Sequence, residues 1–145
     1  MRSLLILLCF ALPLLATAQN KPERRYIKPE GPTPRPFNEA VIVGDTMYVA
    51  GHIGLDPKTG KPPAEVDQEI KLLLDGFKAT IEKGGMTMDD LVMVTVHCPD
   101  VSLYNKFNAA YVKYFKGDLP ARAFLGSGPL LFGAHFEMLG TAVKR

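Results

Sequence analysis

Two amphipathic helical patterns, each set between short β-rich runs, constrain this fold more than any other feature of the sequence. From Glu65 to Lys83, apolar residues recur at the three- and four-residue spacing of one helix face, and Gly84-Gly85 ends the pattern. A second such pattern runs from Ser102 to Phe115 and ends at Gly117. Because right-handed crossovers place the connecting helices on one side of a sheet, we expect both helices on the same face.

The β-rich runs are short and bounded by turn residues, and they lie at 40–43, 46–53, 91–98, 121–125 and 133–143. Gly44-Asp45 between the first two is typical of a two-residue hairpin turn. The predicted order is β-β-α-β-α-β-β, an α+β fold with one mixed sheet. The sheet face opposite the helices needs a cover, so we expect an oligomer in which such faces pack together.

The N-terminus has the pattern of a signal peptide. Arg2 is followed by the apolar run Leu4 to Leu15 and then by the small residues Ala16-Thr17-Ala18. The run is shorter than the roughly 20 residues that a membrane-spanning helix needs. We therefore expect cleavage after Ala18, a periplasmic or secreted mature chain beginning at Gln19, and no membrane association after cleavage.

Residues 19–36 are rich in proline and poor in large apolar side chains, which predicts an extended arm and no packed element before a domain at 37–145. Once Arg2 is removed, the mature chain is close to neutral, which argues against a nucleic-acid partner. Cys9 lies in the leader, so Cys98 is the only cysteine left and forms no intrachain disulfide. We expect its thiol to be buried.

The residues give little support to a metal or cofactor site. His52, His97, Cys98 and His135 supply soft ligands, but no two histidines have the i, i+4 spacing of a helical zinc site. Gly126-Ser127-Gly128 lacks both the glycine spacing and the following helix of a phosphate-binding loop. We expect neither a metal nor a phosphate cofactor.

Two charged residues interrupt apolar strands. Arg122 lies within Leu119 to Leu125, and Glu137 is flanked by Phe136 and Met138. One interpretation is an arginine on the solvent face of an edge strand, and another is a salt bridge between the two residues across a hairpin. The functional interpretation is an arginine that binds a substrate carboxylate and a glutamate that handles a water molecule.

Five segments carry a resemblance to a known family, and they match it in order and spacing from about residue 36 to the end: Pro36–Ala40, Val49–Gly60, Phe107–Tyr111, Leu119–Arg122 and Phe136–Val143. On these segments the chain resembles the Rid family, also called the YjgF family, whose members include proteins named endoribonuclease L-PSP.

The resemblance implies a chorismate-mutase-like fold and a homotrimer with active sites in the clefts between subunits, working without a cofactor. It implies hydrolysis of reactive 2-imino acids, or their enamine tautomers, to 2-keto acids and ammonia. Arg122 then matches the arginine that binds the substrate carboxylate, and Glu137 matches the glutamate that orients the attacking water. Asn108 matches a polar residue near the site, and the backbone around Gly51 lines the pocket.

Three positions depart from the pattern that the resemblance implies. Phe37 stands where many deaminase members have tyrosine, Ala50 where they have serine, and Phe124 where they have cysteine. Phe37 and Phe124 are expected to contact the substrate, so the pocket is more apolar than that of the deaminase members. Such a pocket favours a bulkier imino acid, a slower enzyme or a site that only binds carboxylates. His52 stands where glutamine is common, and it either faces the site or caps backbone at the rim.

The leading hypothesis is an exported imine deaminase that uses Arg122 and Glu137 on a small 2-imino acid. A non-catalytic trimer that binds carboxylates in the same cleft is the second. An endoribonuclease of the L-PSP type is the third, which the near-neutral charge disfavours. A chaperone-like role after oxidation has no specific residue to support it.

Overall fold

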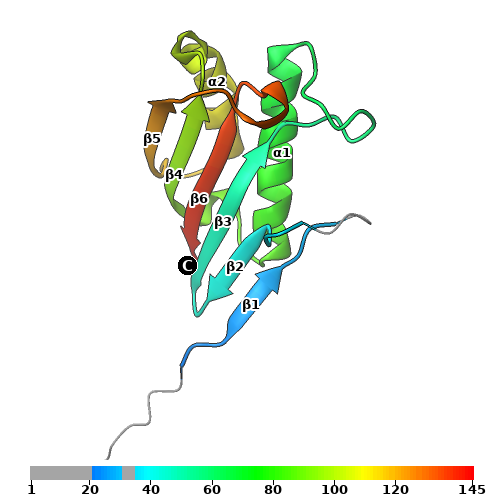
Figure 1. Cartoon of the computed structure of the whole chain (residues 1–145). Coiled ribbons are helices and arrows are strands. Elements are labelled where there is room, and N and C mark those ends of the chain that lie inside the picture. The colour runs from blue at the N-terminus through cyan, green and yellow to red at the C-terminus, as the bar shows by residue number, and fades with distance from the viewer. Residues whose placement is uncertain (1–20, 31–34) are drawn as a thin grey trace, which may run out of the picture.

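In the computed structural model, which describes residues 21–30 and 35–145, a single mixed sheet is covered on one face by two helices (Figure 1). The strands are β1 (Arg24–Ile27), β2 (Ala40–Val43), β3 (Thr46–Ile53), β4 (Leu91–Cys98), β5 (Ala121–Gly126) and β6 (Glu137–Val143), and the helices are α1 (Val66–Lys83) and α2 (Tyr104–Tyr111). Across the sheet the order is β1-β2-β3-β6-β4-β5. The predicted α+β fold, with both helices on one face, is confirmed.

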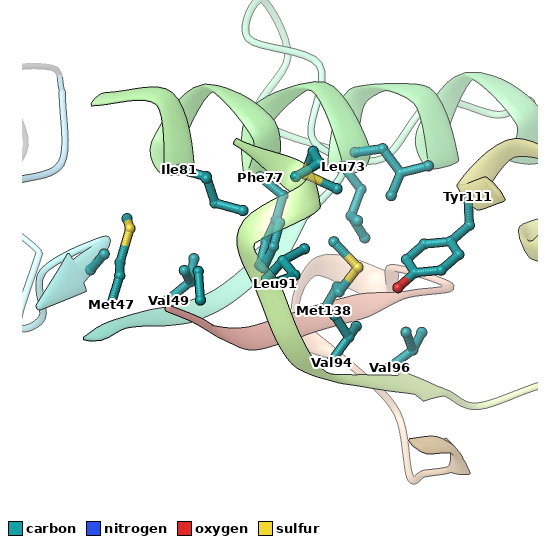
Figure 2. Packing of buried hydrophobic residues seen from close by; sticks show 14 of the residues in the cluster. Met47, Val49, Leu73, Phe77, Ile81, Leu91, Val94, Val96, Tyr111 and Met138 are labelled. Carbon is teal, nitrogen blue, oxygen red and sulfur yellow. The ribbon is translucent and has the colours of Figure 1, made fainter. Parts of the chain in front are cut away.

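The apolar face of α1 packs on the sheet and forms the core (Figure 2). Leu73, Phe77 and Ile81 are each 0% exposed and follow the four-residue spacing of one helix face. They meet every second residue of the central strands: Met47, Val49, Val94, Val96 and Met138. Full burial of one such side chain contributes about 1.5–3 kcal/mol, so this layer fixes α1 on the sheet.

The N-terminal arm contains a strand, which corrects the sequence prediction for residues 19–36. β1 pairs antiparallel with β2, and the Glu39 N–H donates to the Ile27 carbonyl at 2.8 Å. Only Ile27 of this strand is buried, so its pattern is too weak to predict. The predicted signal peptide and its cleavage site lie outside the described residues. No helix among the described residues is long and apolar enough to span a membrane.

The last two strands do not form a hairpin. β5 runs parallel to β4, and β6 lies between β3 and β4, antiparallel to both. The connection from β5 therefore crosses the end of β4, and β6 begins at Glu137 and not at the predicted Gly133. The second helix is also shorter than predicted, because 3₁₀ turns at Val101–Leu103 and Val112–Tyr114 flank α2.

The sheet face that the helices leave open carries exposed apolar side chains. Residues on this face alternate with the core residues along each strand. The large ones are all more than a third exposed: Tyr26, Tyr48, Met93, Leu125, Leu139 and Val143. An apolar surface of this kind is typical of a face that another protein surface covers.

Candidate active site

Arg122 lies on the helix-covered face of β5, at the edge of the sheet. It pairs in register with Val94, whose side chain is buried under the helices. Its Nη2 donates to Asn108 Oδ1 of α2 at 2.6 Å. Phe124, two residues along the strand, shares this face and stands beside it. Three of the predicted site residues, Asn108, Arg122 and Phe124, therefore lie together.

Aromatic rings surround the guanidinium. Arg122 Cζ lies 4.7 Å from the ring centroid of Tyr111 and 5.6 Å from that of Tyr104, and two further rings, Phe107 and Phe124, lie within 6.0 Å. Burial raises the pKa of Tyr111 to about 12, so that ring stays neutral. Within the described ranges Arg122 forms no ion pair. The rings hold a cation that remains available to an external anion.

A cavity of about 360 Å³ opens beside Arg122. This volume falls within the range of small-ligand sites, roughly 300–1,000 Å³. The lining combines one guanidinium and one amide with largely apolar side chains: Asn108, Tyr111, Val112, Leu119, Pro120 and Arg122. Such a lining suits a small molecule with a carboxylate and an apolar remainder.

Glu137 begins β6 on the opposite face of the sheet. Its neighbour Met138 is buried in the core, so the Glu137 side chain points to the open face. A Cβ added at Gly51 would lie 2.1 Å from Glu137 Oε1, which means that the carboxylate occupies the space that this glycine leaves. Gly51 and Glu137 therefore meet on the open face of the sheet.

Arg122 and Glu137 do not meet within one chain. β4 separates their strands, and the two side chains point to opposite faces of the sheet. The predicted salt bridge across a hairpin is therefore wrong. The interpretation of Arg122 as a solvent-facing arginine is also wrong, because Arg122 is partly buried beside α2.

Phe37 lies just before β2 and is 50% exposed. β3, β6 and β4 lie between β2 and β5, so Phe37 is far across the sheet from Arg122. The other predicted residues form two groups, with Asn108, Arg122 and Phe124 on the helix-covered face and Gly51 and Glu137 on the open face.

His52 faces helix α1 and not Glu137. Its Nδ1 donates to the Ala50 carbonyl at 2.9 Å, and its Nε2 lies 2.9 Å from Thr80 Oγ1. The ring packs edge-on against Phe77, with centroids 5.2 Å apart. Burial lowers the pKa of His52, which favours the neutral imidazole. Of the two interpretations of His52, the structure supports the backbone-capping one.

Tyr104 is a candidate site residue that the sequence analysis missed. Its ring packs edge-on against Phe124, with centroids 5.0 Å apart. Hydrogen bonds to Asn108 and then to Arg122 lower the pKa of Tyr104. It brings a hydroxyl close to the Arg122 guanidinium. The sequence does hold a signal for Tyr104. It lies four residues before Asn108, a spacing that places the two side chains next to each other on one helix face.

Cys98 is buried, as predicted. Its Sγ donates to the Asp100 carbonyl at 3.0 Å, and burial raises the pKa of the Cys98 thiol. Among residues 21–30 and 35–145, no group of three His, Cys, Asp or Glu side chains is arranged to hold a metal ion.

The single mixed sheet with both helices on one face and an arginine-lined cavity at the sheet edge define the class of the protein as α+β. The family model described as Endoribonuclease L-PSP matches residues 30–144. The chain belongs to this family, which is the Rid/YjgF family, and has its chorismate-mutase-like fold.

Known relatives support this assignment. The chain is 34% identical over 96 residues to a RutC family protein of Sulfurisphaera tokodaii, covering 66% of this chain and 74% of that one. It is 34% identical over 109 residues to a rat protein named 2-iminobutanoate/2-iminopropanoate deaminase, covering 74% and 80%. A crystal structure of E. coli TdcF with bound serine superposes with a TM-score of 0.72 at 25% identity, covering 83% and 94%.

Proposed function

We propose that this protein is an exported, trimeric deaminase that hydrolyses small 2-imino acids to 2-keto acids and ammonia. The observation that carries the proposal is the partly buried Arg122, held by Asn108 and aromatic rings at a cavity and without a carboxylate partner in the described ranges. The deaminase name of the rat relative supports the reaction.

Arg122 binds the substrate in this proposal. Its Nη2 already donates to Asn108, which orients the guanidinium plane. The remaining N–H groups pair with the two carboxylate oxygens of a 2-imino acid. The imine carbon, one bond from that carboxylate, is then fixed for attack.

Glu137 handles the water. As the water oxygen bonds to the imine carbon, Glu137 takes one of its protons, the C=N electron pair moves to nitrogen, and Glu137 passes that proton to the nitrogen, which gives a carbon bearing OH and NH₂. Glu137 then takes the hydroxyl proton and passes it to the nitrogen. The C–N bond breaks as the C=O bond forms, ammonia leaves, and Glu137 is again a carboxylate. General-base assistance of this kind contributes typically about 10²- to 10⁴-fold.

The site has to be assembled from two subunits, because Arg122 and Glu137 lie on opposite faces of one sheet. In the proposed homotrimer the open sheet faces pack together, and Arg122 of one subunit meets Glu137 of its neighbour. The apolar side chains of the open face, among them Tyr48 and Leu139, suit such packing.

Export is the remaining part of the proposal, and it rests on the predicted signal peptide of residues 1–18. A periplasmic or secreted deaminase needs a source of imines there. Oxidation of amino acids outside the cytoplasm yields 2-imino acids directly.

The test generates 2-imino acids in situ with an amino-acid oxidase and follows their loss with purified residues 19–145. We expect acceleration by the wild-type protein, a drop of at least about 100-fold in kcat for Glu137→Gln, and loss of saturation for Arg122→Ala. The side chain that is preferred reports on Phe37 and Phe124. No acceleration for any imino acid would overturn the proposal.

A carboxylate-binding trimer without turnover is the second candidate. It is favoured by the apolar residues Phe37, Ala50 and Phe124, and by the serine bound to the related TdcF. Calorimetric titration with serine and with 2-keto acids separates the two functions. Binding that depends on Arg122, with no hydrolysis in any variant, would establish the binder. Cleavage of single-stranded RNA that disappears in Arg122→Ala would instead favour a ribonuclease.

A further inference from the structure

Glu69 of α1 is completely buried, and its carboxylate binds the two residues that precede Glu137. Its Oε1 accepts the N–H of His135 at 2.7 Å and that of Phe136 at 3.3 Å. The His135 ring donates from Nδ1 to Oε2 at 2.6 Å. A buried carboxylate without donors costs several kcal/mol, so these three bonds tie the start of β6 firmly to α1.

The end of β3 is fixed to the same residue. A Cβ added at Gly54 would lie 2.1 Å from the backbone oxygen of Glu69, so the chain passes α1 at a distance that only glycine permits. Ile53, the neighbour of Gly54, pairs with Glu137. Glu69 therefore stands where α1, β3 and β6 meet, and it holds the backbone that leads into Glu137.

The register of β6 decides which way Glu137 points. A slip of one residue would turn Glu137 into the core and bring Met138 to the open face. Glu69 holds two successive N–H groups just before this position, and so prevents the slip. We propose that Glu69, together with His135, is the positioning residue for Glu137, an inference that rests on the proposed imine hydrolysis.

Two substitutions at one position test this. Glu69→Ala removes the acceptor, whereas the amide oxygen of Glu69→Gln still accepts both N–H groups and its NH₂ can donate to the other His135 tautomer. We expect Glu69→Ala to lower kcat about 10- to 100-fold with KM within about threefold, because Arg122 is untouched. Glu69→Gln should retain most of kcat. A loss of equal size in both variants, or a change confined to KM, would overturn the proposal.

A double-mutant cycle isolates the effect that passes through Glu137. In a Glu137→Gln background, Glu69→Ala should lower kcat no further, since the group that it positions is gone. The same fold-loss in both backgrounds would contradict the proposal. Glu82→Ala, at an exposed glutamate of α1 whose carboxylate meets Lys78 of the same helix, is the matched control and should leave kcat unchanged.

Amide hydrogen exchange tests the positioning without any catalysis. The N–H groups of His135 and Phe136 should exchange at least about tenfold faster in Glu69→Ala, and Glu69→Gln should restore their protection. Unchanged exchange would overturn the proposal even in an active enzyme. A wild-type protein that hydrolyses no imine refutes the proposed function instead. Should Glu69→Ala not fold, His135→Ala, at a side chain that is 41% exposed, should raise the same exchange rates by less.

Discussion

Arg122 is held by one amide and several aromatic rings, and this arrangement determines which substitution it tolerates. Lysine would keep the charge but has no planar pair of N–H groups for a carboxylate. We expect Arg122→Lys to raise KM for 2-imino acids at least about tenfold with a smaller change in kcat. Steady-state kinetics measure both. An unchanged KM would show that the carboxylate binds elsewhere.

Gly51 leaves the space that the Glu137 carboxylate fills. In Gly51→Ala, the added Cβ would displace the end of a flexible side chain on the open face, so the fold persists while the carboxylate moves. We expect a loss of about 10- to 100-fold in kcat with little change in melting temperature. Full activity in a folded Gly51→Ala variant would contradict the role of Glu137.

His52 makes folding sensitive to acid. Burial lowers the pKa of His52 in the native state, with smaller opposing effects from the Ala50 carbonyl and Glu39. Below about pH 6.5 the unfolded chain therefore binds more protons than the native one, and stability falls as pH falls. We expect chemical denaturation between pH 7 and 5 to show a decline of at most about 1.4 kcal/mol per pH unit from this group, and a flatter profile in His52→Gln. Identical pH profiles of stability in the wild-type protein and His52→Gln would contradict this role of His52.

At the scale of elements, the sequence predicts those helices and turns that short-range preferences determine. The periodicity of α1 and the hairpin turn at Gly44, where φ is 58°, both follow from short-range preferences. β1 was not predicted, because only one of its residues, Ile27, is buried and its sequence therefore shows no alternation of apolar and polar residues. The start of β6 was placed four residues early, because the bonds from Glu69 that hold His135 and Phe136 are long-range.

Ile27 is the one buried side chain of β1. Ile27 is 8% exposed at the edge of the core. We expect Ile27→Ala to lower the free energy of unfolding by about 1–3 kcal/mol, less than a central core residue would. Arg24→Ala, in the same strand and exposed, is the matched control and should change it by less than about 0.5 kcal/mol. Equal effects in a denaturation series would show that β1 is not anchored by its apolar contact.

At the scale of the whole molecule, the site depends on strand order, which the sequence pattern does not encode. Arg122, Asn108 and Phe124 were predicted as site residues and do lie together. The relation of Arg122 to Glu137 was not predicted, because it depends on the insertion of β6 between β3 and β4. That insertion leaves β4 between the two strands, and the register of each strand turns the two side chains to opposite faces.

The open sheet face should therefore be an interface. Leu139 lies on it in β6, next to β4, and is 37% exposed. We expect wild-type protein to have three times the protomer mass by light scattering, and Leu139→Arg to dissociate into folded, inactive monomers, because a charge without a partner is costly to bury. A monomeric wild-type protein with full activity would contradict a shared site.

Mixing two inactive variants tests the shared site most directly. Arg122→Ala and Glu137→Gln are each denatured, combined in equal amounts and refolded, and imine hydrolysis is then measured. If Arg122 of one subunit works with Glu137 of its neighbour, about a quarter of all sites in the refolded mixture regain both residues, because each residue is intact in half of the subunits. We predict recovery of about a quarter of wild-type activity. No recovery from a mixture shown to contain mixed trimers would mean that the two residues do not act together across subunits.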